Sequence, residues 1–389
     1  MKIAYVTETW PPEVNGVSLT VARTVSYLRS HGHEVELIRP KQSSEDHGEP
    51  ETVLVRGIPI PMYPDLRMGL PVAKRLYRRW RDSPPDLVHI ATEGPLGWSA
   101  SRAAQRLGIV ATSDFRTRFD EYGKHYVGKM FSHLVNLYLR MFHNDTACTF
   151  VPTPEMRLLL QRAGYENLRV SERGVDADLF SPLHRSESLR ASWGLAAKRD
   201  EIGGPAVLYV GRLAREKNLP LVFEAFDALR VRVPTARLII VGSGPLRASF
   251  ERSHPEAVFA GVQTGSALAA YYASADLFLF PSLTETFGNV TLEAMASGIP
   301  VVAYDSAAAG MYIRNGVSGY ALPRGDSAAF VKATCELAAD SDLRMRLSVA
   351  ARCVAETKQW KDVLARFDAQ IKDVILTKSC NELAKLANS

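Results

Sequence analysis

One stretch, residues 276–302, constrains the fold of this chain more than any other part of it. It opens with an apolar run at 277–280 that is typical of a buried strand, and from 289 the apolar residues recur at helical spacing. A second apolar run follows at 299–303. This succession predicts a strand, a loop, a helix and a strand. Parallel sheets are built from such units, and they bind ligands at their carboxyl edge.

The loop of this unit carries polar groups to that edge. Glu285 precedes the helix and Glu293 lies inside it, so the two carboxylates lie at different depths around one helix N-terminus. The amides of Phe287, Gly288 and Asn289 suit a phosphate or a sugar oxygen, and ionised carboxylates accept hydrogen bonds from neutral polyols. The loop therefore suits a sugar linked to a nucleotide diphosphate. The alternative is a solvated capping glutamate at 285 and a surface glutamate at 293.

The block Glu285-Thr-Phe-Gly-Asn-Val-Thr-Leu-Glu293, with its flanks at 281–282 and 296–302, resembles a family signature. Retaining glycosyltransferases of the GT-B architecture, family 4, carry two glutamates separated by seven residues in this context. The resemblance implies that Glu285 contacts the donor sugar and that Glu293 holds the ribose. It also implies that the three neighbouring amides hold sugar and phosphate oxygens.

A second block follows the predicted strand at 206–210. Arg212 and Lys217 leave the end of that strand, where two fixed cations would stabilise the charge on a departing diphosphate. Scattered surface cations are the alternative. The block resembles a characteristic one of the same family, which implies diphosphate binding by both residues. The resemblance further implies that Gly16 lies against the donor phosphates and that the nucleotide base is contacted near Val262.

The segment 113–122 departs from the family pattern. Many members carry a histidine here that approaches the reacting sugar, whereas the matching residue in this chain is Arg116, followed by Thr117 and Phe119. An arginine cannot accept a proton at neutral pH, but it can hold a phosphate or sugar oxygen. Two interpretations stay open: an active enzyme in which Arg116 positions substrate, or a degenerate one. The intact donor motifs favour the first.

Two features of the first half concern the acceptor and its surroundings. Glu93 follows a predicted strand at 87–91, where it either contacts the acceptor or caps the next helix. A predicted helix at 70–81 interleaves aromatic and basic residues, which is typical of a helix on an anionic membrane surface or of an ordinary solvated face. Its cations are Lys74, Arg75, Arg78, Arg79 and Arg81.

The predicted fold class is α/β: the GT-B architecture, with two Rossmann-like doubly wound domains facing a central cleft. A chain of 389 residues is long enough for two cores. Residues 1–180, completed by a C-terminal helix at 362–389, are expected to bind the acceptor, and residues 185–361 the nucleotide sugar. The proline-rich stretch 58–69 is expected to be irregular.

The resemblance implies transfer of a hexose from a nucleotide diphosphate sugar to a lipid or glycan, with retention. The Arg-Thr-x-Phe segment at 116–119 resembles bacterial lipid mannosyltransferases, which favours GDP-mannose as donor. Neither a cofactor nor a metal is expected, because Asp176 and Asp178 offer too few oxygen ligands for manganese. The alternatives are a sugar-nucleotide epimerase of the same architecture and a catalytically degenerate nucleotide-sugar-binding module.

Composition narrows the class of protein further. The hydrophobic fraction of 46% and the charged fraction of 23% are typical of globular proteins. The first residues lack the pattern of a signal peptide, and no apolar run approaches the length of a membrane span. The chain is therefore expected in the cytoplasm, either in solution or peripheral on the inner face of the cell membrane. A net charge of +5 permits an anionic partner, but no nucleic-acid-binding motif accompanies it.

Overall fold

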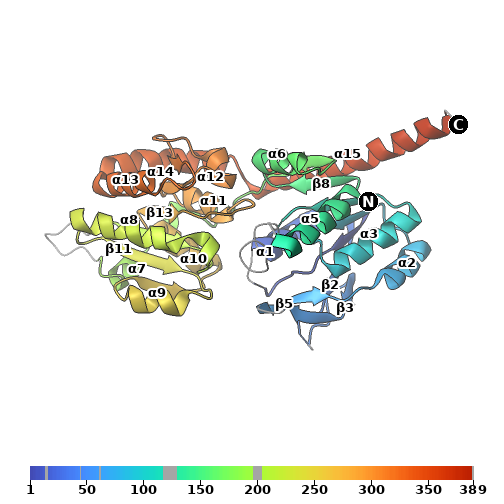
Figure 1. Cartoon of the computed structure of the whole chain (residues 1–389), viewed down its shortest axis with the longest axis horizontal. Helices are drawn as coiled ribbons and strands as arrows, with labels where there is room; N and C mark the ends of the chain where they lie inside the picture. The colour runs from blue at the N-terminus through green and yellow to red at the C-terminus, as the bar shows by residue number, and fades with distance from the viewer. Residues whose placement is uncertain (14–15, 44, 61–62, 117–128, 196–203, 388–389) are drawn as a thin grey trace. The chain divides into compact units, whose positions relative to one another are not determined.

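The computed structural model describes residues 1–13, 16–43, 45–60, 63–116, 129–195 and 204–387. The chain divides into two compact units, one made of Met1–Glu172 and Lys361–Ser389 and the other of Arg173–Trp360. Each unit is built around a parallel sheet with helices on its faces (Figure 1).

The sheet of the first unit has seven strands in the order β3-β2-β1-β6-β7-β8-β9, and its neighbours pair in parallel. Apolar runs without polar alternation, such as Ile3 to Val6, explain why its central strands are covered on both faces. The strands are β1 (Lys2–Val6), β2 (Glu34–Pro40), β3 (Thr52–Val55), β6 (Leu87–Ile90), β7 (Ala111–Asp114), β8 (Cys148–Val151) and β9 (Leu168–Val170).

Alternate residues of these strands face two separate helical layers. Ala4 and Val6 pack in a cluster with side chains of α2 (Ala73–Asp82), α3 (Pro95–Leu107) and α5 (Lys129–Asn144). Ile3 and Tyr5 pack instead with α1 (Gly16–Ser30) and with α15 (Trp360–Ala387). The layer of α2, α3 and α5 therefore covers one face of the sheet. Among the described helices, none combines the length and the apolar composition needed to cross a bilayer.

The segment 58–69 contains two strands, one on either side of residues 61–62, so the expectation of irregular structure was wrong. Strands β4 (Gly57–Ile60) and β5 (Tyr63–Gly69) pair antiparallel, with Pro59 opposite Arg67. In a sheet of only two strands each strand is an edge, and an edge tolerates a residue that lacks an amide hydrogen. Proline content therefore did not exclude a strand here.

The sheet of the second unit has six strands in the order β12-β11-β10-β13-β14-β15, again with parallel pairing. Its strands are β10 (Ala206–Val210), β11 (Arg237–Val241), β12 (Val258–Gly261), β13 (Leu277–Phe280), β14 (Val301–Tyr304) and β15 (Gly319–Leu322). Its α-helices are α7 (Glu187–Ser192), α8 (Leu219–Arg232), α9 (Arg247–Ser253), α10 (Gly265–Ser274), α11 (Asn289–Ala296), α12 (Ala307–Tyr312), α13 (Ser327–Ala339) and α14 (Ser341–Glu356).

The chain passes into the second unit after Glu172, earlier than the expected boundary at residue 180. The Val175 amide donates to the Lys358 carbonyl at 2.8 Å, and the Arg352 guanidinium donates to the carbonyls of Ala177 and Phe180 at 2.9 and 2.7 Å. These contacts hold residues 173–180 against the end of the second unit. At the other end of the chain, Phe367 of α15 is buried in a core cluster of the first unit.

Both sheets reverse their strand order at the first strand. In the first unit this point lies between β1 and β6, and in the second between β10 and β13. Ligands of doubly wound sheets bind outside the carboxyl ends of the strands at such a point. The residues that follow these four strands therefore lie where a ligand is expected to bind.

Candidate active site

The loops after β10 and β13 meet in an ion pair. Oε1 of Glu285 accepts hydrogen bonds from the Lys217 ammonium and, at 2.9 Å, from the Ser282 hydroxyl. The Leu283 amide donates to the Glu216 carbonyl at 2.9 Å, which ties the two loops together. The Lys217 and Glu285 side chains are 18% and 14% exposed, so the pair is held by protein and still reachable by a ligand. Lys217 and Glu285, which the sequence predicted as donor-binding residues in separate blocks, thus lie side by side.

The chain then turns into α11 through a left-handed residue. Gly288 has φ 80° and is the N-cap of the helix, a conformation that glycine adopts without a Cβ clash. The Phe287 carbonyl accepts from the Ala308 amide at 2.8 Å, which fixes the approach of the loop. The first amides of an α-helix have no acceptor inside the helix, so this N-terminus suits an anionic or oxygen-rich ligand.

Glu293 lies within α11 and is held separately from Glu285. The Tyr272 hydroxyl donates to its Oε2 at 3.0 Å. Tyr272 is fully buried, and burial together with the Glu293 charge raises the pKa of that phenol well above its usual value. The phenol therefore stays protonated and keeps the Glu293 carboxylate in a fixed orientation.

The loops after β10, β11 and β12 pack closely at the same edge. The Gly242 amide donates to the Gly261 carbonyl at 2.7 Å, and a Cβ on Gly242 would lie 2.0 Å from the Gly211 carbonyl oxygen. Because glycine has no side chain at position 242, the three loops can approach one another this closely. Arg212 follows Gly211, and its carbonyl accepts from the Tyr209 hydroxyl at 3.0 Å, while Val262 follows Gly261 and is exposed.

In the first unit, two carboxyl groups follow β1 and β6. Oε1 of Glu8 accepts from the Leu96 amide at 2.8 Å, and a Cβ on Gly94 would lie 2.2 Å from its Oε2. Burial raises the pKa of Glu8 to about 7 and that of Glu93 to about 8. Oε1 of Glu93 is buried without a hydrogen-bond partner among the described residues. Both carboxyl groups therefore retain a proton to higher pH than an exposed glutamate does.

Glu8 was missed by sequence reasoning, which considered only Glu93 at this edge. A signal was present, because Glu8 stands just beyond the apolar run at 3–6, as Glu93 does beyond the predicted strand at 87–91. Neither position is special until β1 and β6 are known to be neighbours.

Arg116 is bound inside the first unit. Its Nε donates to Oδ2 of Asp114 at 2.8 Å, and His89 Nε2 lies 3.2 Å from the same oxygen. Burial lowers the pKa of a guanidinium, but the charges of Asp114, Tyr5 and Glu93 and the hydrogen bond to Asp114 together outweigh this, and the pKa of Arg116 is raised. The side chain is therefore a permanent cation. Its Nη1 is buried and has no hydrogen-bond partner among the described residues.

The remaining predicted positions are described only in part. Gly16 is the first residue of α1, and its carbonyl accepts from the Thr20 hydroxyl at 2.7 Å. Thr117 and Phe119 lie outside the described residues. Oδ1 of Asp176 accepts from the Leu179 amide at 3.1 Å, so this carboxylate caps a turn. Within the described parts of the chain, no group of three His, Cys, Asp or Glu side chains is arranged to hold a metal ion.

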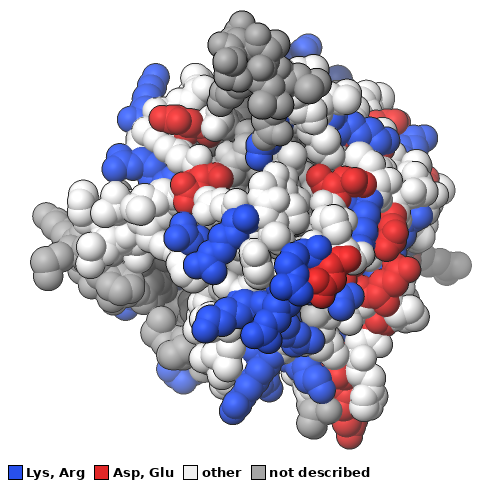
Figure 2. Space-filling model, turned by 90° about the vertical axis from the view of Figure 1, so that its right-hand side faces the viewer, with Lys and Arg blue, Asp and Glu red and all other residues white. Residues whose placement is uncertain are grey.

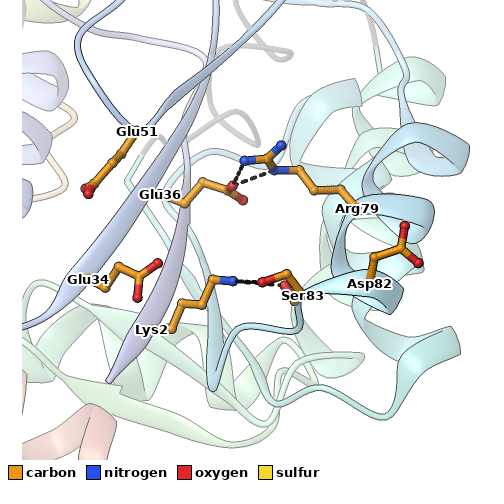
Figure 3. Close-up of a pocket in the computed structure, with 7 residues that line it drawn as sticks. All are labelled: Lys2, Glu34, Glu36, Glu51, Arg79, Asp82 and Ser83. Atoms are coloured by element: carbon orange, nitrogen blue, oxygen red, sulfur yellow. Dashed lines mark hydrogen bonds and ion pairs between the residues drawn. The ribbon is translucent and has the colours of Figure 1, made fainter.

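A cavity of about 490 Å³ lies at the opposite, amino end of β1 and β2 (Figure 3). Lys2 points toward Ser83 and Arg79 toward Glu36, as Figure 3 shows, so these charged groups are paired within the wall. Because ligands of doubly wound sheets bind at the carboxyl edge, this cavity is not part of the candidate site.

Comparison with known proteins agrees with this fold. Residues 14–179 match the family model described as "Glycosyltransferase Family 4", and residues 204–340 match "Glycosyl transferases group 1". A sucrose-phosphate synthase from Thermosynechococcus elongatus superposes with a TM-score of 0.76 at 19% identity, covering 97% of this chain and 100% of the other. The fold class is therefore GT-B, as the sequence predicted.

Two relatives establish the family. The chain is 34% identical over 332 residues to a "GDP-mannose-dependent alpha-mannosyltransferase" of Mycobacterium tuberculosis, covering 84% of this chain and 85% of the relative. It is 30% identical over 360 residues to a "Sulfoquinovosyl transferase" of Arabidopsis thaliana, covering 90% of this chain and 68% of the relative. The chain belongs to glycosyltransferase family 4.

The raised pKa of Glu93 can be tested through the pH dependence of folding stability. Burial raises this pKa from an ordinary 4.5 to about 8, so between these values the unfolded chain has lost a proton that the folded chain retains. Stability contributed at this position therefore falls as pH rises, by at most about 1.4 kcal/mol per pH unit. We expect Glu93→Gln to remove this slope, as measured by urea unfolding from pH 5 to pH 9.

The size of any offset between the two stability profiles reflects the buried amide, and only the difference between their slopes bears on the pKa of Glu93. The exposed Glu336→Gln serves as control and should keep the wild-type slope. Parallel profiles for Glu93→Gln and wild type would show that Glu93 does not retain its proton in the folded protein.

Proposed function

We propose that this glycosyltransferase moves mannose from GDP-mannose to a lipid acceptor with retention of the anomeric configuration. The Lys217–Glu285 pair at the point where the second sheet reverses its strand order, beside the N-terminus of α11, is the observation that carries the proposal. A cation for the diphosphate and a carboxylate for the sugar hydroxyls stand next to each other there. The names of the mannosyltransferase relatives support GDP-mannose as donor.

Each donor group has a chemical role in this proposal. Arg212 and Lys217 bind the diphosphate and stabilise its charge as it departs. Glu285 accepts hydrogen bonds from the sugar, and Glu293 from the ribose hydroxyls. The amides of 287–289 bind sugar and phosphate oxygens. The guanine contacts the backbone at Val262, and Gly16 allows the phosphates to approach α1.

Retention without a protein nucleophile requires departure and attack on one face of the sugar. The fixed cations lower the energy of the separated charges in that transition state, so no cofactor or metal ion takes part in the proposed reaction. The leaving phosphate accepts the proton of the acceptor hydroxyl. Glu93, with Glu8 beside it, orients that hydroxyl, and Arg116, held by Asp114, places its Nη1 hydrogens toward a substrate oxygen.

A panel of UDP-, GDP- and ADP-sugars tests the proposal, with EDTA present and with or without a lipid extract. GDP release from GDP-mannose that rises with the extract is the expected result. Donor binding by thermal shift without release of nucleotide under either condition would favour the degenerate binding module. Conversion of the sugar without nucleotide release would favour the epimerase.

We further propose that the protein works at the cytoplasmic face of a membrane, bound through α2. Lys74, Arg78 and Arg81 are exposed on this helix, and Figure 2 shows Lys and Arg side chains gathered on the face that carries it. Arg79 instead pairs with Glu36, and Arg75 donates to the Leu54 carbonyl at 3.1 Å. Lys74 and Arg78 thus face outward, as does Arg81, which pairs at the surface with the neighbouring Asp82.

The triple variant Lys74→Gln, Arg78→Gln, Arg81→Gln is expected to lose membrane affinity. Each basic residue near an anionic bilayer contributes on the order of 1 kcal/mol, so affinity should fall about 100-fold. Flotation with phosphatidylglycerol vesicles measures this loss. Neutralising Arg252, Arg324 and Lys332, exposed cations of the second unit, changes the net charge equally and should not reduce binding. If both variants lost the same amount of vesicle binding, the effect would depend on net charge alone and not on the position of the cations on α2.

A further inference from the structure

Helix α5 presents a row of large apolar side chains to solvent. Leu134, Leu137, Tyr138 and Met141 recur at a spacing of three or four residues, which places them on one face of the helix. They are 60%, 39%, 38% and 60% exposed, whereas Leu139 and Phe142 are buried. A helix of a water-soluble protein normally buries such a stripe. The exposed apolar row of α5 is therefore expected to be covered by a binding partner.

The row continues onto the start of α3. Trp98 is 43% exposed, and together with Tyr138 it lines a pocket of about 340 Å³ with Glu93, Gly94 and Pro95. The Tyr138 hydroxyl donates to the Glu93 carbonyl at 2.7 Å. These apolar side chains therefore border Glu93, the residue that we assign to the acceptor. We call Trp98, Leu134, Leu137, Tyr138 and Met141 the apolar surface.

Cations flank the apolar surface within the same helical layer. Helices α2, α3 and α5 cover one face of the sheet, and their sequences contain a single acidic residue, Asp82. Arg102 lies 5.8 Å from the centroid of the Trp98 ring, and Lys74 and Arg78 are exposed on α2. Aromatic and aliphatic side chains beside cations match the boundary between acyl chains and anionic headgroups.

We propose that the apolar surface inserts into the acyl boundary of an anionic bilayer while the cations of α2 and α3 bind headgroups. A lipid acceptor then reaches Glu93 without leaving the bilayer. This inference rests on the lipid acceptor of the proposed function and adds the surface that presents it. A second protein copy fits less well, since two such faces would bring their cations together without acidic partners.

Trp98 is a built-in reporter of insertion. Trp10, Trp80 and Trp193 are buried and Trp360 is half-buried, so quenchers reach the exposed Trp98 most readily. With vesicles of phosphatidylcholine and phosphatidylglycerol, we expect its emission to shift to shorter wavelength and its quenching by aqueous acrylamide to fall. Lipids brominated on their acyl chains should quench it. The Trp98→Phe protein should lose all three changes, which assigns them to this residue.

A matched pair of double variants tests the energetic role of the apolar surface. Leu134→Glu with Met141→Glu places two carboxylates on it, whereas Met345→Glu with Val349→Glu does so on equally exposed positions of α14. Since removing a buried leucine-sized side chain from an apolar medium costs tenfold or more in affinity, roughly a 100-fold loss is expected for the α5 variant alone. Its residual binding should vanish in high salt, because only the cations remain to hold it.

Three results would overturn the inference. One is acrylamide quenching of Trp98 that vesicles do not change although the protein floats with them. Another is equal flotation of the two double variants. A third is oligomerisation of the wild type, abolished by Leu134→Glu with Met141→Glu, together with unchanged vesicle binding, which would assign the surface to a second copy. GDP release from GDP-mannose with no product on lipid, despite insertion, would instead contradict the lipid acceptor of the proposed function.

Discussion

Glu285→Gln is expected to lower kcat for mannosyl transfer on the order of 100-fold, with a smaller change in KM. The amide keeps the shape of the side chain but removes the charge that accepts from Lys217 and from the sugar hydroxyls. A hydrogen bond to a charged group that strengthens as the sugar–phosphate bond breaks acts mainly on kcat. Steady-state kinetics of GDP release with saturating acceptor measure the effect.

The control for this variant is Glu336→Gln, which alters a long, exposed pair with Lys332 on α13 of the same unit. It should leave both kinetic constants within about twofold, because exposed ion pairs contribute little. Thermal unfolding should show that both proteins are folded. If Glu285→Gln transferred mannose at the wild-type rate, the assignment of the donor site to this loop would be wrong.

Asp114→Asn is expected to destabilise the first unit by about 3–5 kcal/mol, because it leaves the buried Arg116 charge without its counter-ion. For a unit of this size the melting temperature should fall by roughly 10 °C. Differential scanning calorimetry measures the shift. The exposed Asp82→Asn, which removes a partner of Arg81 at the surface, should change it little.

A double variant separates the charge effect from loss of shape. Adding Arg116→Gln to Asp114→Asn removes the unpaired cation and should restore part of the lost stability. A melting temperature unchanged in Asp114→Asn, or lowered further in the double variant, would contradict the ion pair as the reason that Arg116 is tolerated in the core.

The donor loop was predictable because its information is local. An apolar run, a proline, a glutamate and a helical repeat follow one another within 276–302, and the structure places β13, α11 and β14 there in that order. Glu285 and Lys217 could each be assigned to a strand end in the same way. Their ion pair could not, because it joins residues 68 positions apart and depends on β10 lying beside β13.

The first unit was harder to predict for the same reason. The carboxyl groups of Glu8 and Glu93 become neighbours only through the parallel pairing of β1 with β6. Arg116 was noticed as a departure from a motif, but its partner Asp114 and the nearby His89 carry no local signature. Proline content likewise gave the wrong answer for 58–69, since two edge strands tolerate Pro59.

The configuration of the product is the most direct measure of the proposed reaction. GDP-mannose labelled with carbon-13 at the anomeric carbon, incubated with the protein, a lipid extract and EDTA, can be followed by NMR. The expected result is an α-linked mannolipid that forms together with GDP from the α-linked donor. A β-linked product, or a product that forms only when divalent metal ions are added back, would contradict metal-independent transfer with retention.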